Sequence, residues 1–153
     1  MHIRKTTILA AAAALLASSG IALAETVTFK GTGTYSVVRA LMPLSNGGAA
    51  LHLSHDTIAT VEPSESGFMS GDCAGLGYIS PEGEVSIDSI CNFNLNSKDG
   101  LVIRGQADLE GSKVKVIGGS GKFSGATGTG TMTRKWVEGN RGSYDYEVKV
   151  TTP

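Results

Sequence analysis

The sequence contains little that points to a known catalytic mechanism. It holds three histidines and two cysteines, and it shows no Ser-His-Asp signature, nucleophile elbow or Cys-x-x-Cys motif. No catalytic residue can be assigned on this basis, and we expect no cofactor and no metal site. Whether the protein has any catalytic activity is a question that its motifs leave open.

Long hydrophobic runs are also absent, apart from a short one near the N-terminus. Two basic residues precede an apolar stretch from Ile8 to Leu16, and Ala22-Leu23-Ala24 is typical of a leader cleavage site. The stretch is too short to span a bilayer, and no later segment approaches the required length. We expect residues 1–24 to be a cleaved signal peptide and residues 25–153 to form one domain. Export by the general secretory route would place the protein in the periplasm or outside the cell.

The sequence also lacks an excess of basic residues. The full chain holds 13 basic and 14 acidic residues, and removal of the two basic residues in the expected leader leaves 11 against 14, a net charge of −3. Binding to nucleic acid requires a basic face. We therefore expect no nucleic-acid partner.

The two cysteines carry more information than any other feature of the chain. Pro81-Glu82-Gly83 has the composition of a three-residue hairpin loop, in which proline presets the first corner and glycine takes the left-handed position. If Ser80 lies opposite Glu84, the same register places Cys73 directly across from Cys91. We expect a disulfide between them, in agreement with export to an oxidising compartment. The alternative is a pair of free buried thiols.

Helical periodicity is absent from the mature chain, whereas apolar residues alternate along several segments. This pattern predicts an all-β protein. We expect eight strands, joined mostly by hairpins. They lie at about residues 26–39, 50–62, 68–80, 84–96, 123–137 and 143–151, with two more strands on either side of Glu110-Gly111.

Two further turns predict the register of the middle strands. Lys98-Asp99-Gly100 repeats the chemistry of the first hairpin loop and would place Cys91 opposite Ala107. A two-residue turn at Glu110-Gly111 would place Ala107 opposite Val114. In both registers the apolar residues stay on the face that carries the cysteines.

A meander of eight strands can form one of two simple architectures, a closed barrel or a sandwich. Closure removes the edge strands that invite aggregation. An eight-stranded barrel also leaves an interior that is filled by side chains or occupied by one small ligand. We therefore predict an up-and-down, eight-stranded antiparallel β-barrel, with a β-sandwich as the alternative.

The segment from Ile117 to Thr131 reads IGGSGKFSGATGTGT. It resembles a motif of the allene oxide cyclase and dirigent-like barrels, in which a double glycine, a further glycine, an aromatic residue and later small residues follow in this order. The matching positions are Gly118, Gly119, Gly121, Phe123, Ala126 and Gly128. The resemblance implies an eight-stranded barrel with a central cavity, in which the motif forms a sharp corner between two strands. It implies no catalytic residue for this chain.

His55 is a titratable residue on a face where polar groups are not expected. His52 falls on the polar face of its strand, but His55 shares a face with Leu51, Leu53 and Val61. An imidazole inside the barrel is either a hydrogen-bonded core residue or a group that contacts a ligand or transfers a proton. The sequence is compatible with both interpretations.

Arg134 also falls on a face that we expect to point inward, together with Trp136. An unpaired buried guanidinium is costly, so Arg134 either reaches solvent at the barrel mouth or holds an anionic group of a ligand. Three tyrosines, at positions 35, 144 and 146, lie on inner faces as well. Together these side chains would line a mixed apolar and polar pocket. The predicted ligand-binding residues are His55, Arg134, Tyr35, Tyr146 and Trp136.

These features favour an exported barrel that binds a small apolar or amphipathic molecule in its lumen. One alternative is a cyclase or isomerase acting on a substrate bound there, because such chemistry can depend on shape and one proton donor. A second alternative is a non-catalytic envelope or interaction module. The expected partner is a small lipophilic ligand, and the sequence predicts no oligomeric state.

Overall fold

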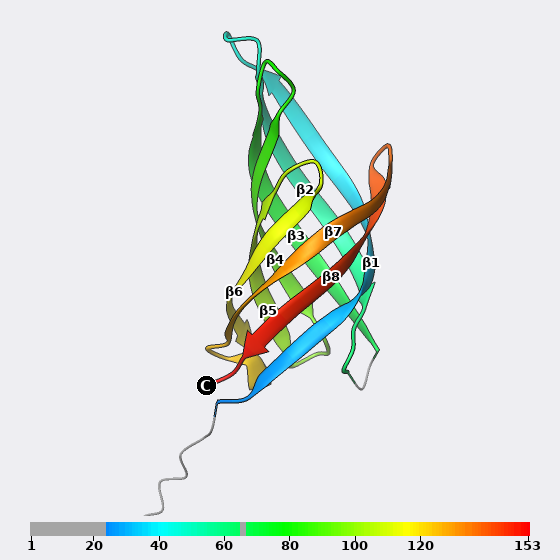
Figure 1. The fold of residues 1–153 in the computed structure, drawn as a ribbon, viewed down its shortest axis with the longest axis vertical. Coiled ribbons are helices and arrows are strands. Elements are labelled where there is room, and N and C mark those ends of the chain that lie inside the picture. The colour runs from blue at the N-terminus through cyan, green and yellow to red at the C-terminus, as the bar shows by residue number, and fades with distance from the viewer. Residues whose placement is uncertain (1–23, 65–66) are drawn as a thin grey trace, which may run out of the picture.

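The computed structural model describes residues 24–64 and 67–153, which form a closed barrel of eight antiparallel strands (Figure 1). Each strand pairs with the next in sequence, and β8 pairs with β1 to close the sheet. The barrel prediction is thus confirmed over the sandwich, whereas the expected signal peptide lies outside the described residues apart from Ala24. The strands are β1 (Thr26–Pro43), β2 (Ala49–Thr60), β3 (Phe68–Ile79), β4 (Val85–Asn94), β5 (Gly100–Ala107), β6 (Gly111–Ser120), β7 (Thr127–Glu138) and β8 (Arg141–Thr151).

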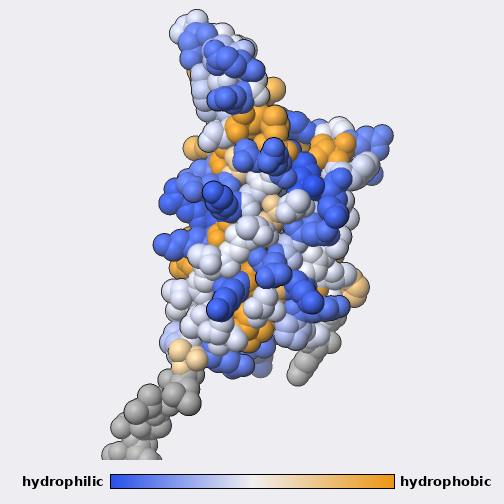
Figure 2. All heavy atoms as spheres, in the orientation of Figure 1, coloured by the Kyte–Doolittle hydropathy of each residue, from blue (hydrophilic) through white to orange (hydrophobic). Residues whose placement is uncertain are grey.

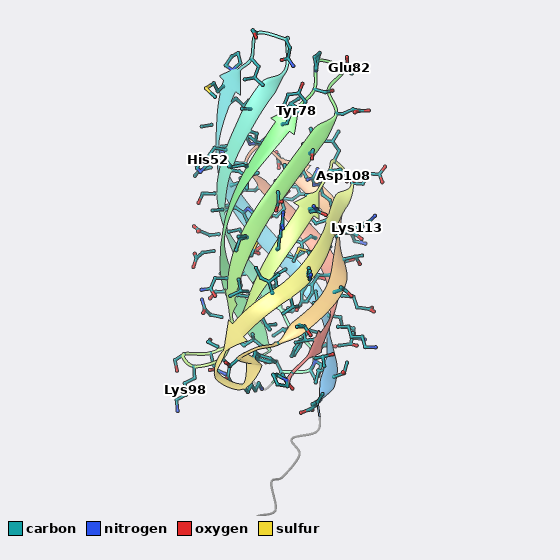
Figure 3. The ribbon with its side chains drawn as sticks, turned by 90° about the vertical axis from the view of Figure 1, so that its left-hand side faces the viewer. His52, Tyr78, Glu82, Lys98, Asp108 and Lys113 are labelled. Carbon is teal, nitrogen blue, oxygen red and sulfur yellow. A yellow bond between two sulfur atoms is a disulfide. The ribbon has the colours of Figure 1, made fainter. Side chains whose placement is uncertain are left out.

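A short 3-10 helix, η1 (Gly121–Phe123), separates β6 from β7. No helix in the described ranges is long and apolar enough to cross a membrane. The C-terminus and η1 lie at the lower end of the barrel in Figure 1, and the β1–β2 and β3–β4 loops project from the upper end. Figure 2 shows a largely hydrophilic surface on this side, with hydrophobic residues gathered near the upper end. Figure 3 labels Lys98 at the lower end and Glu82 on a loop at the upper end.

Aromatic and aliphatic side chains fill the lower end of the barrel. Phe29 on β1 packs edge to face against Phe123, with ring centroids 5.8 Å apart. Burial of such side chains contributes about 25 cal/mol for each Å² of apolar surface removed from water. This end is the hydrophobic core that stabilises the closed sheet. The largest side chains that are almost completely buried are Phe93, Val61, Val116 and Val150.

The β3–β4 hairpin has the predicted register. Cys73 lies opposite Cys91, and the two form the expected disulfide, with Cα atoms 4.0 Å apart. The Ser80 N–H donates to the Glu84 carbonyl at 2.8 Å, and the Gly83 N–H donates to the Ser80 carbonyl at 3.0 Å. Gly83 takes the left-handed conformation, with φ of 90°. Both cysteine side chains are buried inside the barrel.

The predicted register between β4 and β5 is wrong by four residues. Cys91 lies opposite Ile103 and not Ala107. The chain turns earlier than expected, because the Asn96 side chain accepts a hydrogen bond from the Asp99 N–H at 2.9 Å. An asparagine that bonds to the backbone a few residues later is itself a turn-forming group. Since the shift is an even number of residues, the apolar side chains remain on the inner face.

The predicted register between β5 and β6 is wrong by two residues, for a similar reason. Ala107 lies opposite Ser112, two residues away from its predicted partner. The Asp108 N–H donates to the Gly111 carbonyl at 3.0 Å, and the Asp108 carboxylate accepts from the Gly111 N–H at 3.0 Å. The two-residue turn is therefore Leu109-Glu110, one position earlier than predicted.

The glycine-rich segment forms the sharp corner between β6 and β7 that the resemblance implied. Gly121 adopts the left-handed conformation, with φ of 59°. A Cβ at this position would lie 2.1 Å from Oδ1 of Asp99, and the same oxygen accepts a hydrogen bond from the Lys122 N–H at 3.1 Å. The corner is thereby attached to the β4–β5 loop. The geometry accounts for this part of the motif as a structural element.

Candidate functional site

The upper end of the barrel encloses a cavity of about 280 Å³. All eight strands contribute side chains to its wall, and most of these side chains are aliphatic. Several wall residues near the rim, such as Leu41 and Val137, are also exposed to solvent, so the cavity opens at this end. One wall residue from each strand, in order, is Tyr35, Leu53, Ile79, Ile87, Ile103, Val114, Arg134 and Tyr144.

The charge on the cavity wall is positive. Within the described ranges, the wall contains Arg39 and Arg134 but no aspartate, glutamate or lysine. Its other polar groups are hydroxyls, including those of Ser89 and Ser112, and the His55 imidazole. A wall of this kind favours a neutral or anionic ligand over a cationic one.

His55 on β2 points into the lumen as predicted and lines the cavity. The centroid of its ring lies 5.9 Å from that of Tyr35, with the planes tilted by 56°. Burial lowers the pKa of His55 below its ordinary value of 6.5, and the neighbouring Asp56 offsets this effect in part. The described part of the chain offers no hydrogen-bond partner to the imidazole. A neutral imidazole with unbonded nitrogens is able to exchange a proton or a hydrogen bond with a molecule in the cavity.

Tyr144 and Thr57 lie deeper in the lumen and are joined by a hydrogen bond. Their hydroxyl oxygens are 2.7 Å apart. Thr57 donates its proton to the Thr34 carbonyl at 2.8 Å, so Tyr144 is the donor within the pair. Burial raises the pKa of Tyr144. The phenol is therefore a neutral group on the cavity wall at physiological pH.

Tyr146 points inward as expected but belongs to the packed core and not to the cavity wall. Its hydroxyl donates to the Thr60 carbonyl at 2.8 Å, and its ring centroid lies 6.2 Å from that of Tyr144. Burial raises the pKa of Tyr146, with smaller effects from Tyr144 and Glu62. The predicted pocket therefore ends above this residue, because the lumen below Tyr144 is filled by side chains.

Two arginine side chains lie at the mouth of the cavity. Arg134 on β7 donates from Nη1 to the Leu109 carbonyl at 2.7 Å and from Nη2 to the Asp108 carbonyl at 3.3 Å. Arg39 on β1 donates from Nη2 to the Gly139 carbonyl at 2.6 Å. Each guanidinium carries five N–H donors, and neither forms a salt bridge with a described carboxylate. Both side chains therefore retain donors for an anionic group.

The position of Arg134 agrees with one of its two predicted roles, a guanidinium that reaches the barrel mouth. The Asp108 carboxylate lies nearby, but hydrogen bonds from the backbone of its own turn lower its pKa more than Arg134 does. Arg39 was not among the predicted residues. Arg39 is the last residue of the first predicted strand, and the alternation that places Tyr35 and Val37 inside the barrel continues to it, so the predicted strand already contained the signal.

Trp136 does not line the cavity, and its predicted inward direction is wrong. The register of β7 against β8 shifts between Arg134 and Trp136, because Lys135 is an extra residue in β7. Such a β-bulge reverses the alternation of side chains beyond it. Trp136 is consequently 49% exposed, and Val137 lines the cavity in its place. The regular alternation in the sequence carries no signal of this bulge.

Comparison with known proteins identifies the fold. No protein-family model and no curated protein matches the chain. Among solved structures, the pterocarpan synthase dirigent protein GePTS1 matches with a TM-score of 0.60 and 16% identity, over 97% of this chain and 99% of that chain. The pterocarpan synthase dirigent protein PsPTS1 matches with a TM-score of 0.54 and 16% identity, over 84% of this chain and 95% of that chain. The chain shares its fold with these dirigent proteins.

A pyocyanin demethylase also aligns with the chain, with a TM-score of 0.47 and 17% identity, over 78% of this chain and 98% of that chain. The two dirigent proteins agree with the resemblance seen in the glycine-rich segment, since both indicate an eight-stranded barrel. At this level of identity the similarity concerns the fold, and a function has to be argued from the residues of the lumen.

Proposed function

We propose that the protein is an exported barrel that binds a small amphipathic molecule, with the apolar part of the ligand in the lumen and an anionic group at the mouth. One observation carries this proposal: an aliphatic cavity of about 280 Å³ lies beneath two arginines with unused donors. A dry apolar cavity of about 150 Å³ accommodates benzene. The lumen therefore has room for a ligand somewhat larger than a single ring.

Octanoate and octanol are suitable probes, because they share an apolar chain and differ in the charged group. Titration calorimetry at neutral pH is expected to show binding of both to the mature protein. Arg39→Gln should weaken octanoate binding by about tenfold, which is the loss of one charge-assisted hydrogen bond, and leave octanol binding within about twofold. Arg104→Gln is the matched control, because Arg104 pairs with Asp88 on the exposed outer surface. Equal weakening of both probes would contradict the role of Arg39.

The place of binding is tested separately by filling the lumen. Ala107 lines the cavity, whereas the adjacent Gln106 is exposed on the outer face of β5. Ala107→Phe should abolish the binding of both probes, and Gln106→Phe should preserve it. Binding that survives Ala107→Phe would exclude the lumen as the site, and failure of both probes to bind the unmodified protein would sink the proposal.

Export is supported by the disulfide and by the leader-like N-terminus. The Cys73–Cys91 bond is of the kind that persists in oxidising compartments. The protein recovered from the periplasm or the medium should begin at Glu25, and denatured samples should show no thiol that reacts with iodoacetamide. Recovery of the uncleaved chain with two reactive thiols would contradict this part of the proposal.

A second candidate function is a cyclase or isomerase, and His55 is the observation that favours it. Its imidazole faces the lumen without a hydrogen-bond partner among the described residues, which suits a group that transfers a proton to a bound substrate. The dirigent neighbours are described as pterocarpan synthases, and an activity on a small ring compound would fit the size of the cavity.

This second function is tested by incubating a metabolite extract with the protein and following it by mass spectrometry. A compound that is converted by the unmodified protein should persist with His55→Gln, while the melting temperature stays within about 2 °C. Parallel losses of folding and conversion would identify His55 as a core residue. Absence of any conversion would leave ligand binding as the function.

A further inference from the structure

His55, Cys73 and Cys91 form a row across three adjacent strands. His55 on β2 lies opposite Cys73 on β3, and Cys73 lies opposite Cys91 on β4. The three side chains share the inner face of the sheet, and their nitrogen and sulfur atoms all lie within 4.8 Å of one another. His55 and Cys91 also line the cavity, so a small solute that enters the lumen reaches this row.

The disulfide occupies both sulfur atoms in the oxidised protein. Two molecules of a small thiol reduce it by donating two electrons and two protons, which yields two cysteine thiols and one small-molecule disulfide. The reduced row then contains two sulfur ligands and one imidazole. The thiolate is the form of cysteine that binds a metal, and binding of a metal ion releases the two thiol protons to solvent.

The spacing of these atoms suits one metal ion. A bond from a metal such as zinc to sulfur is about 2.3 Å and to imidazole nitrogen about 2.0–2.1 Å. Two ligand atoms on one ion are therefore separated by at most about 4.6 Å, and the three atoms lie within 4.8 Å of one another. The two sulfur atoms are joined by the disulfide bond in the oxidised protein, so rotation of the cysteine side chains after reduction has to move them apart to this separation. The backbone of the three strands would keep its register.

The chemistry of the row selects the ion. Two thiolates and one imidazole form a soft ligand set, and the described cavity wall offers no carboxylate to add a hard ligand. Soft thiolate ligands suit both Cu(I) and zinc, but a structural zinc site requires four ligands, one more than the three residues of the row supply. We propose that reduction of the Cys73–Cys91 disulfide converts this row into a Cu(I) site inside the lumen.

The experiment uses the mature protein with its disulfide intact or reduced, under anaerobic conditions. A phosphine reductant supplies the two electrons and becomes the phosphine oxide, while water supplies its oxygen and the two thiol protons. After removal of the phosphine, Cu(I) is titrated in competition with bicinchoninate. We expect one Cu(I) per reduced chain and none per oxidised chain. Equal binding by the two forms would overturn the proposal.

The contribution of His55 separates this site from an ordinary pair of thiols. His55→Ala should weaken Cu(I) binding by at least about tenfold, and the matched variant His52→Ala, on the outer face of the same strand (Figure 3), should leave it unchanged. Equal affinities of the two variants would overturn the proposal, as would tighter binding of Zn²⁺ than of Cu(I).

Two measurements keep the test independent of the variants. X-ray absorption of the copper-loaded, unmodified protein should show two sulfur ligands and one nitrogen ligand, and a spectrum with sulfur ligands alone would overturn the assignment. The circular dichroism spectrum of the reduced protein should keep its β-sheet form before copper is added. Unfolding at that step would also overturn the proposal, because the row depends on the sheet. The X-ray absorption and circular dichroism results are both independent of whether the oxidised protein binds octanoate.

Discussion

The hydroxyl oxygens of Tyr144 on β8 and Thr57 on β2 lie 2.7 Å apart, although 87 residues separate them in the sequence. Their strands are not neighbours, because β1 lies between them in the barrel. The hydrogen bond therefore passes over the inner face of β1. Both side chains are buried and both contribute to the cavity wall, so this pair links the cavity to the packed core below it.

Removal of the Tyr144 hydroxyl is expected to have a measurable but moderate cost. In Tyr144→Phe, Thr57 keeps its hydrogen bond to the Thr34 carbonyl, so no buried donor is left unsatisfied. The free energy of unfolding in urea should fall by about 1 kcal/mol, the net value of one hydrogen bond. Tyr78→Phe is the control, because its hydroxyl bonds to Asn46 at the surface, and its change should stay within about 0.5 kcal/mol. Equal decreases in the free energy of unfolding of the two variants would show that the buried hydrogen bond stabilises the fold no more than the surface one does.

The corner at Gly121 should be more sensitive to alanine than the hairpin glycine Gly83. Both have positive φ, which costs alanine about 1–2 kcal/mol. At Gly121 the added Cβ also meets the Asp99 carboxylate, whereas nothing lies within 4 Å of a Cβ at Gly83. We expect Gly121→Ala to lower the free energy of unfolding by at least about 1 kcal/mol more than Gly83→Ala. Identical urea midpoints for the two variants would argue against the attachment of the corner through Asp99.

Acid should destabilise the protein in part through His55. Burial lowers the pKa of His55 from its ordinary value of 6.5, so the unfolded chain takes up this proton before the folded chain does as the pH falls. The stability of the folded state therefore decreases as the pH drops below 6.5 towards the lowered pKa of the folded state. The difference in free energy of unfolding between the unmodified protein and His55→Gln should shrink over this range.

The control for this pH effect is His52→Gln, at an exposed position on the outer face (Figure 3). Chemical denaturation at neutral and mildly acidic pH supplies the comparison for both variants. If the difference for His55→Gln stays constant or grows as the pH falls, the imidazole is not held in a buried environment.

Fluorescence should report Trp136 as a residue outside the lumen. It is the one tryptophan of the chain, and it is 49% exposed. Its emission should be quenched by iodide, and saturation of the protein with octanoate should alter neither the emission maximum nor the quenching. A blue shift on addition of octanoate would restore the prediction that this side chain points into the pocket.

The sequence predicted most of the features that depend on local patterns. Alternation placed His55 and Arg134 on the inner face, and both line the cavity. The Pro-Glu-Gly turn set the β3–β4 register and with it the disulfide. Two other turns were misplaced, because Asn96 and Asp108 bond to nearby backbone and compete with neighbouring turns of similar energy. The errors left the inner face intact, since each was an even number of residues.

What the sequence by itself determined is the all-β class, the disulfide hairpin and the side of the sheet on which most side chains lie, since these follow from a two-residue period and from turn chemistry within a few residues. The tertiary structure alone decided three other features: the pairing of β8 with β1, the bulge at Lys135 that turns Trp136 outward, and the depth at which Tyr144 and Tyr146 close the cavity. These features depend on the packing of side chains that are distant in the sequence, and no local sequence pattern contains that information.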